Sequence, residues 1–406
     1  MSQSIGIIGA GLIGRMLAFE LLLDGFDVHL FDRDNELGKG SCAWVGAGMI
    51  TPYAELDVSE EFVFVLGRES LKLMPEFLAK LPEKVFFQQN GSLILAHNQD
   101  RADFMRFQKN LESKLASILP TSLDGASACT TLSKLSGTSI KREAPERGHS
   151  VRPSDIVDPK FIDPNSNPAH QILNTAGITA LEPSLGNRFS LGLYLPSEGQ
   201  VDNRQLLAAL ANGLKKQGVH WQANTEVTAI KPGIITTSSG THKFSQVIDC
   251  RGMGAKLDLP GLRGVRGEII RIIAPEVSLN RPVRLMHPRY PIYITPRENH
   301  HFVIGATVIE SEDMSPVTIQ SALELLSAAF SLHSGFAHAS ILEMERQCRP
   351  ALPDNMPRIF VEPGLIRING LYRHGFLVSP KLVQLTKAIL QGTKIEPEFQ
   401  QVVCKN

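Results

Sequence analysis

The sequence lacks the features that mark secreted, nucleic-acid-binding and zinc-binding proteins. Only five cysteines occur in 406 residues, an odd number without any C-x-x-C spacing, which argues against a disulfide framework and a zinc site. Neither charge sign is in excess, because 41 lysines and arginines balance 41 aspartates and glutamates. No block of like charge indicates nucleic acid or an anionic membrane as a partner. We expect reduced thiols, a cytoplasmic protein without a metal, and a small-molecule ligand.

Targeting and membrane-spanning patterns are also missing. The N-terminus has no basic leader, and its apolar run is interrupted by glycines, so we expect neither a signal peptide nor a membrane span. No low-complexity tract or internal repeat is evident. A chain of this length is long enough for two domains and can bury a large core.

The first motif that is present is a G-x-G-x-x-G turn between an apolar strand and a helix. Its glycines are Gly9, Gly11 and Gly14, which would permit a tight turn, a close approach of backbone N–H groups to a pyrophosphate, and close packing of helix on strand. The next strand, residues 26–31, ends in Asp32, an acid placed to bind the ribose of an adenosine. The combination predicts a dinucleotide site and disfavours the alternative, a glycine-rich turn without a ligand.

Small residues dominate a second stretch, residues 38–50. Such a loop lets the backbone approach a flat or phosphorylated ligand, and the alternative is an ordinary flexible connection. A third stretch lies near the C-terminus, where a strand at 366–369 is followed by a glycine turn and a helix. Ser379 is the predicted N-cap of that helix and Pro380 its first helical residue. Two helix N-termini, each a positive pole, would suit a flavin, one facing its pyrophosphate and the other its ring.

Hydrophobic periodicity predicts the other elements. The expected helices cover residues 60–81 with an interruption at Pro75, 101–119, 203–217 with Asp202 as N-cap, and 317–333; the expected strands cover 92–96, 219–223, 226–230, 246–250, 266–273, 291–296 and 302–306. The strands from 219 to 250 suit a return to the nucleotide-binding sheet, whereas those from 266 to 306 predict an antiparallel sheet that carries the substrate. Residues 133–169 are polar and contain prolines, which indicates irregular loops.

Taken together, these stretches resemble the glycine oxidase and D-amino-acid oxidase family of FAD enzymes, and most of all the glycine oxidases of thiamine biosynthesis. The matching pieces are the glycine turn with Asp32, GAGMITPYAE at 46–55, YITPR at 293–297, GAT at 305–307, RP at 349–350, and YRHG at 372–375 near Ser379 and Pro380. The resemblance spans almost the whole chain and is least diagnostic from about residue 96 to 195.

The resemblance implies FAD as the cofactor and an α/β fold. An FAD-binding, Rossmann-like domain of the glutathione-reductase type would be assembled from residues 1–85, 196–262 and 340–406. An α+β substrate domain with a mainly antiparallel sheet would contain residues 86–195 and 263–339.

The resemblance also implies oxidation of glycine or another small amino acid or amine. A hydride would pass from the α carbon to flavin N5 to give an imine for thiamine thiazole synthesis, and oxygen would reoxidise the flavin and yield hydrogen peroxide. By position, Tyr293, Arg349 and Arg373 would bind the substrate carboxylate, which a planar guanidinium holds through two parallel hydrogen bonds. The implied cofactor contacts, besides the three glycines, are Leu12, Ile13, Asp32, Arg33, Cys42, Ala43, Ala47, Gly48, Met49, Val227, Leu371, Tyr372, Arg373, His374, Gly375, Phe376 and Leu377.

Several roles stay open at this point. Arg373 also suits a surface ion pair, Tyr293 a plain core position, and His374 either a structural role or a place beside the flavin's pyrimidine edge. No side chain stands out as the base that deprotonates the amine. Three positions depart from the family pattern: Asp32 stands where many relatives have Glu, Arg251 where a small residue is common, and His374 where some glycine oxidases have Asn.

The expected partners are a small amino acid or amine and oxygen. The sequence leaves open a homo-oligomer and a hand-over of the imine to a thiazole synthase. Two other functions remain as alternatives: a D-amino-acid dehydrogenase that passes electrons to a quinone, and a nucleotide-binding sensor or assembly protein without catalysis. Arg349 and Arg373 argue against the sensor.

Overall fold

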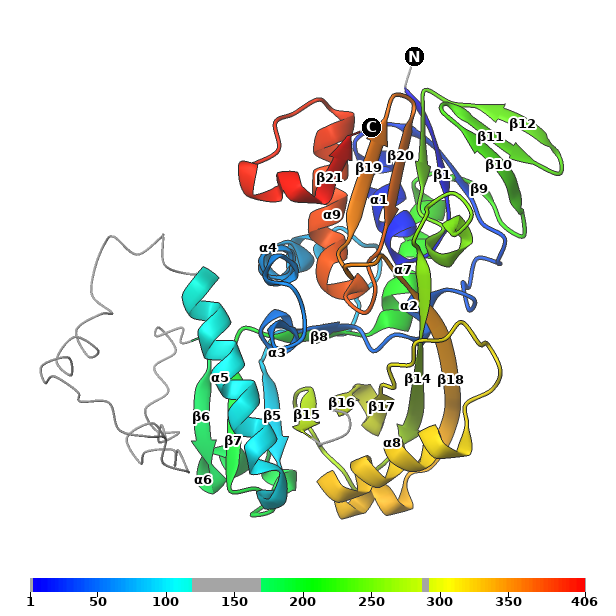
Figure 1. Ribbon diagram of the computed structural model, residues 1–406. Coiled ribbons are helices and arrows are strands. Elements are labelled where there is room, and N and C mark those ends of the chain that lie inside the picture. The colour runs from blue at the N-terminus through cyan, green and yellow to red at the C-terminus, as the bar shows by residue number, and fades with distance from the viewer. Residues whose placement is uncertain (1–2, 119–168, 287–291, 406) are drawn as a thin grey trace, which may run out of the picture.

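Two large sheets, each with its own helices, make up most of the structure (Figure 1). The structure is a computed structural model that describes residues 3–118, 169–286 and 292–405. All but the last residue of the predicted irregular segment 133–169, and the first residue of the predicted strand 291–296, lie outside the described residues. Within the described ranges, no helix is both long enough and apolar enough to cross a membrane.

The first sheet contains seven strands in the order β21-β19-β20-β13-β1-β2-β9. Neighbouring strands are parallel except for β19 and β20. The central strand β1 is buried along residues 5–8, as expected for a strand covered on both faces. The strands are β1 (Ser4–Ile8), β2 (Asp27–Phe31), β9 (His220–Gln222), β13 (Gln246–Asp249), β19 (Arg358–Glu362), β20 (Leu365–Asn369) and β21 (Val403–Lys405).

Four helices share one apolar core with this sheet. They are α1 (Leu12–Leu23), α4 (Glu61–Ala79), α7 (Asn203–Lys216) and α9 (Gly375–Leu390). Helix α1 packs against both α7 and α9, and α4 packs against α9, so α1 is buried between the sheet and other helices. Asp202 caps α7 as predicted, because its carboxylate accepts hydrogen bonds from the backbone N–H groups of Arg204 at 2.9 Å and Gln205 at 3.0 Å.

The second sheet contains eight strands in the order β18-β14-β17-β16-β15-β5-β7-β6. All neighbours are antiparallel except β15 and β5. Helix α8 packs on β14, β16 and β17, and α5 packs on β5. The two sheets confirm the predicted fold class. The elements are β5 (Ser92–Ala96), α5 (Arg101–Ile118), β6 (Gln171–Asn174), β7 (Leu191–Leu195), β14 (Arg263–Ile273), β15 (Val283–Met286), β16 (Ile292–Pro296), β17 (His301–Gly305), α8 (Ile319–Leu332) and β18 (Ser340–Ala351).

Two three-stranded sheets, three short α-helices and several 3-10 helices are the other elements of the described residues. The predicted strand 226–230 does not join the nucleotide-binding sheet: β10 pairs with β11 instead, and its Val227 and Ile230 pack over Ile8 and Phe31. The missed hairpin partners are only four residues long, and β12 is polar, so neither strand gives a clear periodic pattern. The elements are α2 (Cys42–Val45), β3 (Met49–Ile50), α3 (Pro52–Leu56), β4 (Phe87–Gln88), α6 (Thr175–Leu181), β8 (Gly199–Val201), β10 (Val227–Lys231), β11 (Ile234–Thr237) and β12 (Gly240–Lys243).

Two prolines do not act as the sequence rules predict. Helix α9 begins at Gly375, not after Ser379, so Pro380 lies inside it, and α4 runs through Pro75 without a break. Each proline removes one backbone hydrogen bond, but the two helices pack against each other along a buried face. This tertiary packing outweighs the local penalty. Ser379 serves the helix differently, since its hydroxyl donates to the Gly375 carbonyl at 2.6 Å.

The long strands β14 and β18 pair across the predicted boundary between the two domains. Strand β18 lies in the range 340–406 that we assign to the FAD-binding domain, yet it pairs with β14 of the eight-stranded sheet from residue 340 to residue 351. Figure 1 shows this ribbon rising from the lower sheet toward α2 and the upper sheet. The domain boundaries themselves stay a prediction.

Candidate active site

The turn between β1 and α1 has the geometry of an anion site. Gly9 has φ +96°, and a Cβ there would lie 2.6 Å from the Cys250 carbonyl oxygen. A Cβ on Gly14 would lie 1.9 Å from the Gly9 carbonyl oxygen, so both positions require glycine. In contrast, a Cβ on Gly11 would meet nothing within 4 Å, and no side chain caps α1. The space in front of Gly11, at the N-terminus of α1, is therefore open and suits a pyrophosphate.

Asp32 lies at the end of β2, beside this turn. Its carboxylate accepts hydrogen bonds from the backbone N–H of Ala10 and, at 2.7 Å, from that of Asp34. These bonds fix the carboxylate and leave acceptor capacity for ribose hydroxyls. Val227 belongs to the small cluster over Phe31, and Arg33 is exposed at the end of the strand. Asp32, Arg33 and Val227, three of the predicted cofactor contacts, therefore lie at or beside the end of β2.

Buried polar side chains hydrogen-bond to the backbone of the small-residue loop. The buried Asn203 side chain donates to the carbonyls of Ala43 at 2.7 Å and Trp44 at 2.9 Å. The buried Arg297 guanidinium donates to the Ala47 carbonyl and, at 2.6 Å, to Gln200. Burial lowers the pKa of Arg297 to about 10. These contacts tie the loop backbone to the start of α7 and to Arg297, the residue that follows β16.

The second helix N-terminus also faces open space. A Cβ on Gly375 would meet nothing within 4 Å, and no side chain caps α9. A Cβ on Gly46 would lie 3.0 Å from the Phe376 ring, so the small-residue loop and the start of α9 are in contact. Five of the remaining predicted cofactor residues share one core cluster, and Leu371 packs against it: Leu12, Ile13, Ala43, Phe376 and Leu377. The others lie on α2 (Cys42), in the loop and β3 (Ala47, Gly48 and Met49) and at the start of α9 (Tyr372, Arg373, His374 and Gly375), and their role as cofactor contacts stays a prediction.

Tyr293 and Arg349 lie across one face of the eight-stranded sheet because two glycines leave room for them. A Cβ on Gly267 would lie 2.1 Å from the Arg349 guanidinium carbon. A Cβ on Gly305, the partner of Tyr293 across β16 and β17, would lie 2.7 Å from the tyrosine hydroxyl. Arg349 and Tyr293 therefore lie flat on β14 and β17 in a partly buried position.

Tyr293, Arg349 and Arg373 affect one another's pKa values. Burial raises the pKa of Tyr293, and the cations of Arg349 and Arg373 act in the opposite direction. Burial lowers the pKa of Arg349, against the influence of Tyr293, and Arg373 adds to the lowering. The three residues predicted to bind a carboxylate are thus brought into one neighbourhood from β16, β18 and the turn before α9.

Arg349 has no ionic partner among the described residues. Its guanidinium donates one hydrogen bond, to the Thr307 carbonyl at 3.1 Å, and no described carboxylate lies within 4.0 Å of it. A partly buried cation that lacks a counter-ion is costly unless an anion joins it. The arrangement can bind a small carboxylate with a matching pair of donors.

Arg373 differs, because it already has a carboxylate partner. It donates to Glu55 from Nε at 2.7 Å and also from Nη2. Burial opposes the arginine cation, but Glu55 outweighs it and raises the pKa of Arg373. Burial also opposes ionisation of Glu55, whereas Arg373, Arg284 and His374 favour it and hold its pKa at about 2. Arg373 does form an ion pair, as the alternative prediction had it, but the pair with Glu55 is largely buried and does not lie on the surface.

His374 is buried and electrically neutral near pH 7. Burial, with Arg373 and Arg349, lowers its pKa to about 4, although Glu55 acts the other way. Its Nδ1 atom is buried without a hydrogen-bond partner and lies 3.7 Å from Glu55 Oε2. A neutral imidazole in this position can accept or donate a proton, depending on its tautomer.

Sequence reasoning missed two polar residues that organise the site. Glu55 lies in the matched stretch 46–55 but had no assigned role, because its partner Arg373 is 318 positions away. Arg15 is fully buried in α1, where it donates to the Ala10 carbonyl at 2.6 Å and the Glu36 carbonyl at 2.9 Å. A lone arginine on an otherwise apolar helix is the signal that could have identified it.

Arg251, one of the departures from the family pattern, has a structural partner. Its Nε and Nη2 atoms each donate to the buried Asp249 carboxylate at 2.9 Å. The pair lies at the end of β13 and leaves the Gly9 turn in contact with the backbone of Cys250. The larger side chain is therefore accommodated without filling the space in front of Gly11.

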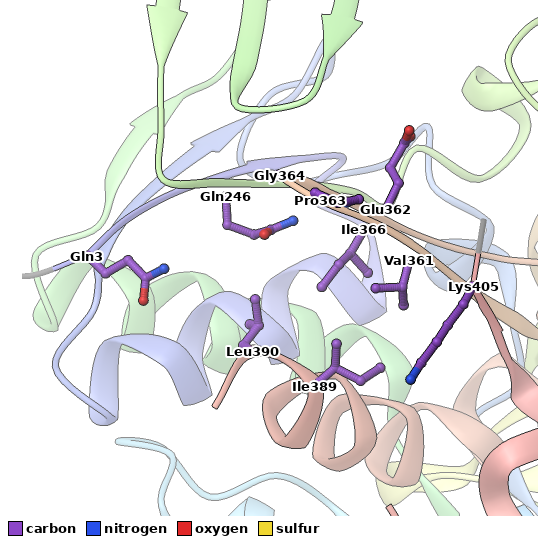
Figure 2. A pocket seen from close by; sticks show the side chains of 10 residues that line it. All are labelled: Gln3, Gln246, Val361, Glu362, Pro363, Gly364, Ile366, Ile389, Leu390 and Lys405. Carbon is purple, nitrogen blue, oxygen red and sulfur yellow. The ribbon is translucent and has the colours of Figure 1, made fainter. Parts of the chain in front are cut away.

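A hollow of about 360 Å³ lies away from all these residues. It is lined by residues at the start of β1 and β13 and by the turn between β19 and β20, including Gln3, Gln246 and Gly364 (Figure 2). Ligands of such parallel sheets bind at the opposite edge, beyond the carboxyl ends of the strands. The hollow contains none of the predicted site residues.

Comparisons with known proteins agree with this geometry. The model of the DAO family, FAD dependent oxidoreductases, matches residues 4–386. A Rhizobium etli protein with the provisional name thiamine biosynthesis oxidoreductase ThiO is 36% identical over 390 residues, which cover 96% of this chain and 97% of that protein. A glycine oxidase of Geobacillus kaustophilus is 25% identical over 93% of this chain and 89% of that protein. The crystal structure of glycine oxidase from the same organism has a TM-score of 0.73, 22% identity, and coverage of 97% and 96%.

Proposed function

Because this chain belongs to the DAO family of FAD-dependent oxidoreductases, we propose that it oxidises glycine or another small amino acid or amine to an imine. We propose an amino acid as substrate because Arg349 has no ionic partner among the described residues and suits a carboxylate. We propose a small substrate because relatives are named glycine oxidase and thiamine biosynthesis oxidoreductase ThiO. The imine would serve the formation of the thiamine thiazole.

FAD fits the residues that the chain presents. Open space in front of Gly11 and Gly375 at two uncapped helix N-termini suits a ligand with a pyrophosphate at one end and a ring that gains negative charge at the other. Asp32 would bind the ribose, and the small-residue loop would lie along the flavin. When bound, FAD supplies hydride acceptance and electron transfer to oxygen, which no side chain provides.

Arg349 carries the proposed substrate binding. Its planar guanidinium would hold the substrate carboxylate through two hydrogen bonds and thereby fix the carbon that is oxidised. Tyr293 would add a hydroxyl donor, since the pKa of its phenol is raised and it stays protonated near pH 7. Arg373 would contribute a third donor while it remains paired with Glu55.

Proton removal from the substrate amine is the other task of the site. The amine must be neutral when its carbon is oxidised, and His374 is the neutral, buried group beside the two arginines. We propose that His374 lies near the substrate amine. We propose that the amine gives its proton to solvent, which reaches the partly exposed Arg349.

Anaerobic mixing tests this function. The purified, FAD-loaded protein is mixed without oxygen with glycine, sarcosine or D-alanine, and the absorbance of the oxidised flavin is followed. We expect bleaching by at least one of the three. The proposal would be refuted if the protein carried no flavin, or if the flavin stayed oxidised with all three substrates.

The electron acceptor and the fate of the imine need separate measurements. Hydrogen peroxide release during turnover in air is expected of an oxidase. Turnover only with an artificial electron acceptor would instead indicate a D-amino-acid dehydrogenase that reduces a quinone. Because a free imine hydrolyses in water, a direct hand-over to a thiazole synthase is part of the proposal, and faster thiazole formation with this protein than with added glyoxylate and ammonia would support it.

A further inference from the structure

Two histidines and an aspartate lie together on the outer edge of the seven-stranded sheet. Asp27 and His29 are two residues apart on β2 and so point to the same face. His220 begins β9, the edge strand, and is the register partner of His29. The metal-binding atoms of the three side chains all lie within 4.8 Å of one another.

The separations fit a metal better than hydrogen bonds. His29 Nε2 lies 3.4 Å from Asp27 Oδ2, and His220 Nε2 lies 3.4 Å from Asp27 Oδ1. Good N–H···O hydrogen bonds measure about 2.7–3.2 Å. Ligands around a tetrahedral ion with bonds of about 2.0–2.1 Å lie roughly 3.3–3.4 Å apart.

The two imidazole rings lie side by side on neighbouring strands. The imidazoles of His29 and His220 stack with centroids 4.4 Å apart and planes 21° apart. The His29 ring also packs against Phe244 of the neighbouring segment, with centroids 5.2 Å apart. The donor set is therefore held by packing and strand register, not only by mutual attraction.

We propose that Asp27, His29 and His220 form a binding site for one divalent transition-metal ion of the Zn²⁺ class. Two imidazole nitrogens and one carboxylate oxygen are ligands that suit such ions, and three protein ligands leave one position for water. The sequence did not predict this site, because its ligands are split between segments 191 residues apart in the chain and none is a cysteine.

The site is separate from the proposed chemistry. Asp27 is the first residue of β2, whereas Asp32 and the glycine turn lie beyond the last residue of the strand. A bound ion would join β9 to β2, and thus connect the segment after α7 to the first βαβ unit of the chain. Its expected effect is on the stability of the sheet edge, not on turnover.

Metal titration of the FAD-loaded protein tests the proposal. Protein made without a polyhistidine tag is treated with EDTA, desalted, and titrated with ZnCl₂ by calorimetry and with CoCl₂ by visible absorption. We expect one ion per chain, a Kd of micromolar or below, cobalt bands typical of nitrogen and oxygen ligands, and a rise in Tm with Zn²⁺.

Three variants make the assignment specific. His220→Gln and Asp27→Asn should each weaken Zn²⁺ binding at least about 10–100-fold, the range seen when even a supporting group is lost. His338→Gln changes an exposed histidine outside the site and should bind Zn²⁺ as the wild type does. His220 is mostly exposed, with 61% of its side chain accessible, so its variant should fold and retain flavin. Absence of Zn²⁺ binding, or equal affinity in all variants, would overturn the proposal.

Discussion

Replacing Arg349 by methionine should separate substrate binding from cofactor binding. Methionine keeps much of the length and apolar contact of the side chain but removes the guanidinium. The loss of one partner from a buried, hydrogen-bonded charge pair costs about 2–5 kcal/mol. Arg349 is partly exposed before substrate binds, so the lower end applies, about 2–3 kcal/mol, which corresponds to roughly a 30- to 150-fold weaker substrate affinity.

The assay is the substrate dependence of flavin reduction under anaerobic conditions, compared for wild type, Arg349→Met and Arg349→Lys. The lysine variant keeps the charge but loses the planar fork, so it should fall between the other two. FAD content should be unchanged, and Tm should not fall, because the guanidinium has no ionic partner to lose among the described residues. Arg358→Met, which breaks a surface pair with Asp354, is the matched control and should leave substrate affinity alone. Unchanged affinity in Arg349→Met would refute the carboxylate assignment.

Four further variants, of Glu55 and of three glycines, have predicted outcomes. Glu55→Gln removes an acid whose pKa is about 2 in the folded protein, below its ordinary 4.5. Its stabilising effect is present above about pH 4.5 and lost as the pH falls toward 2, so Tm should depend less on pH below 4.5 in the variant; equal slopes would contradict this. Gly11→Val should fold but lose FAD, seen as loss of yellow colour, whereas Gly14→Ala should lower Tm by clashing with the turn; full flavin content in Gly11→Val would count against the pyrophosphate site. Gly267→Ala should displace Arg349 and weaken substrate binding at least about 10-fold with FAD retained, as measured in the same anaerobic titration; wild-type affinity would show that Arg349 can move without cost.

Local features of the fold were predictable from the sequence. The turn at Gly9 to Gly14 and the acid at Asp32 follow a short motif that can be read within one βαβ unit. Gly14 packs on the Gly9 carbonyl in the same turn, whereas the contact that requires Gly9 comes from the distant Cys250. The cap at Asp202 was equally local. The start of α9 was wrong because the rule for Pro380 ignores packing, and the helix is held from Gly375 by its contact with α4.

The parts that could not be predicted join distant segments. The pair of Glu55 and Arg373 and the register of His29 with His220 depend on which strands and turns become neighbours. No periodicity within either segment carries that information. The family resemblance assigned Tyr293, Arg349 and Arg373 the same role, binding of the substrate carboxylate. In the structure the three residues are close enough for the two arginines to affect the pKa of Tyr293. Their roles stay predictions.

Gly267 and Gly305 affect how such enzymes should be recognised in other genomes. A search for the arginine alone would accept any chain that has it, even one in which a side chain on β14 pushes the guanidinium out of the site. Since a Cβ at position 267 or 305 would collide with Arg349 or Tyr293, glycine at both positions indicates that the polar residues can reach their places. We therefore predict that glycine at both positions marks the proposed carboxylate site more specifically than the arginine alone.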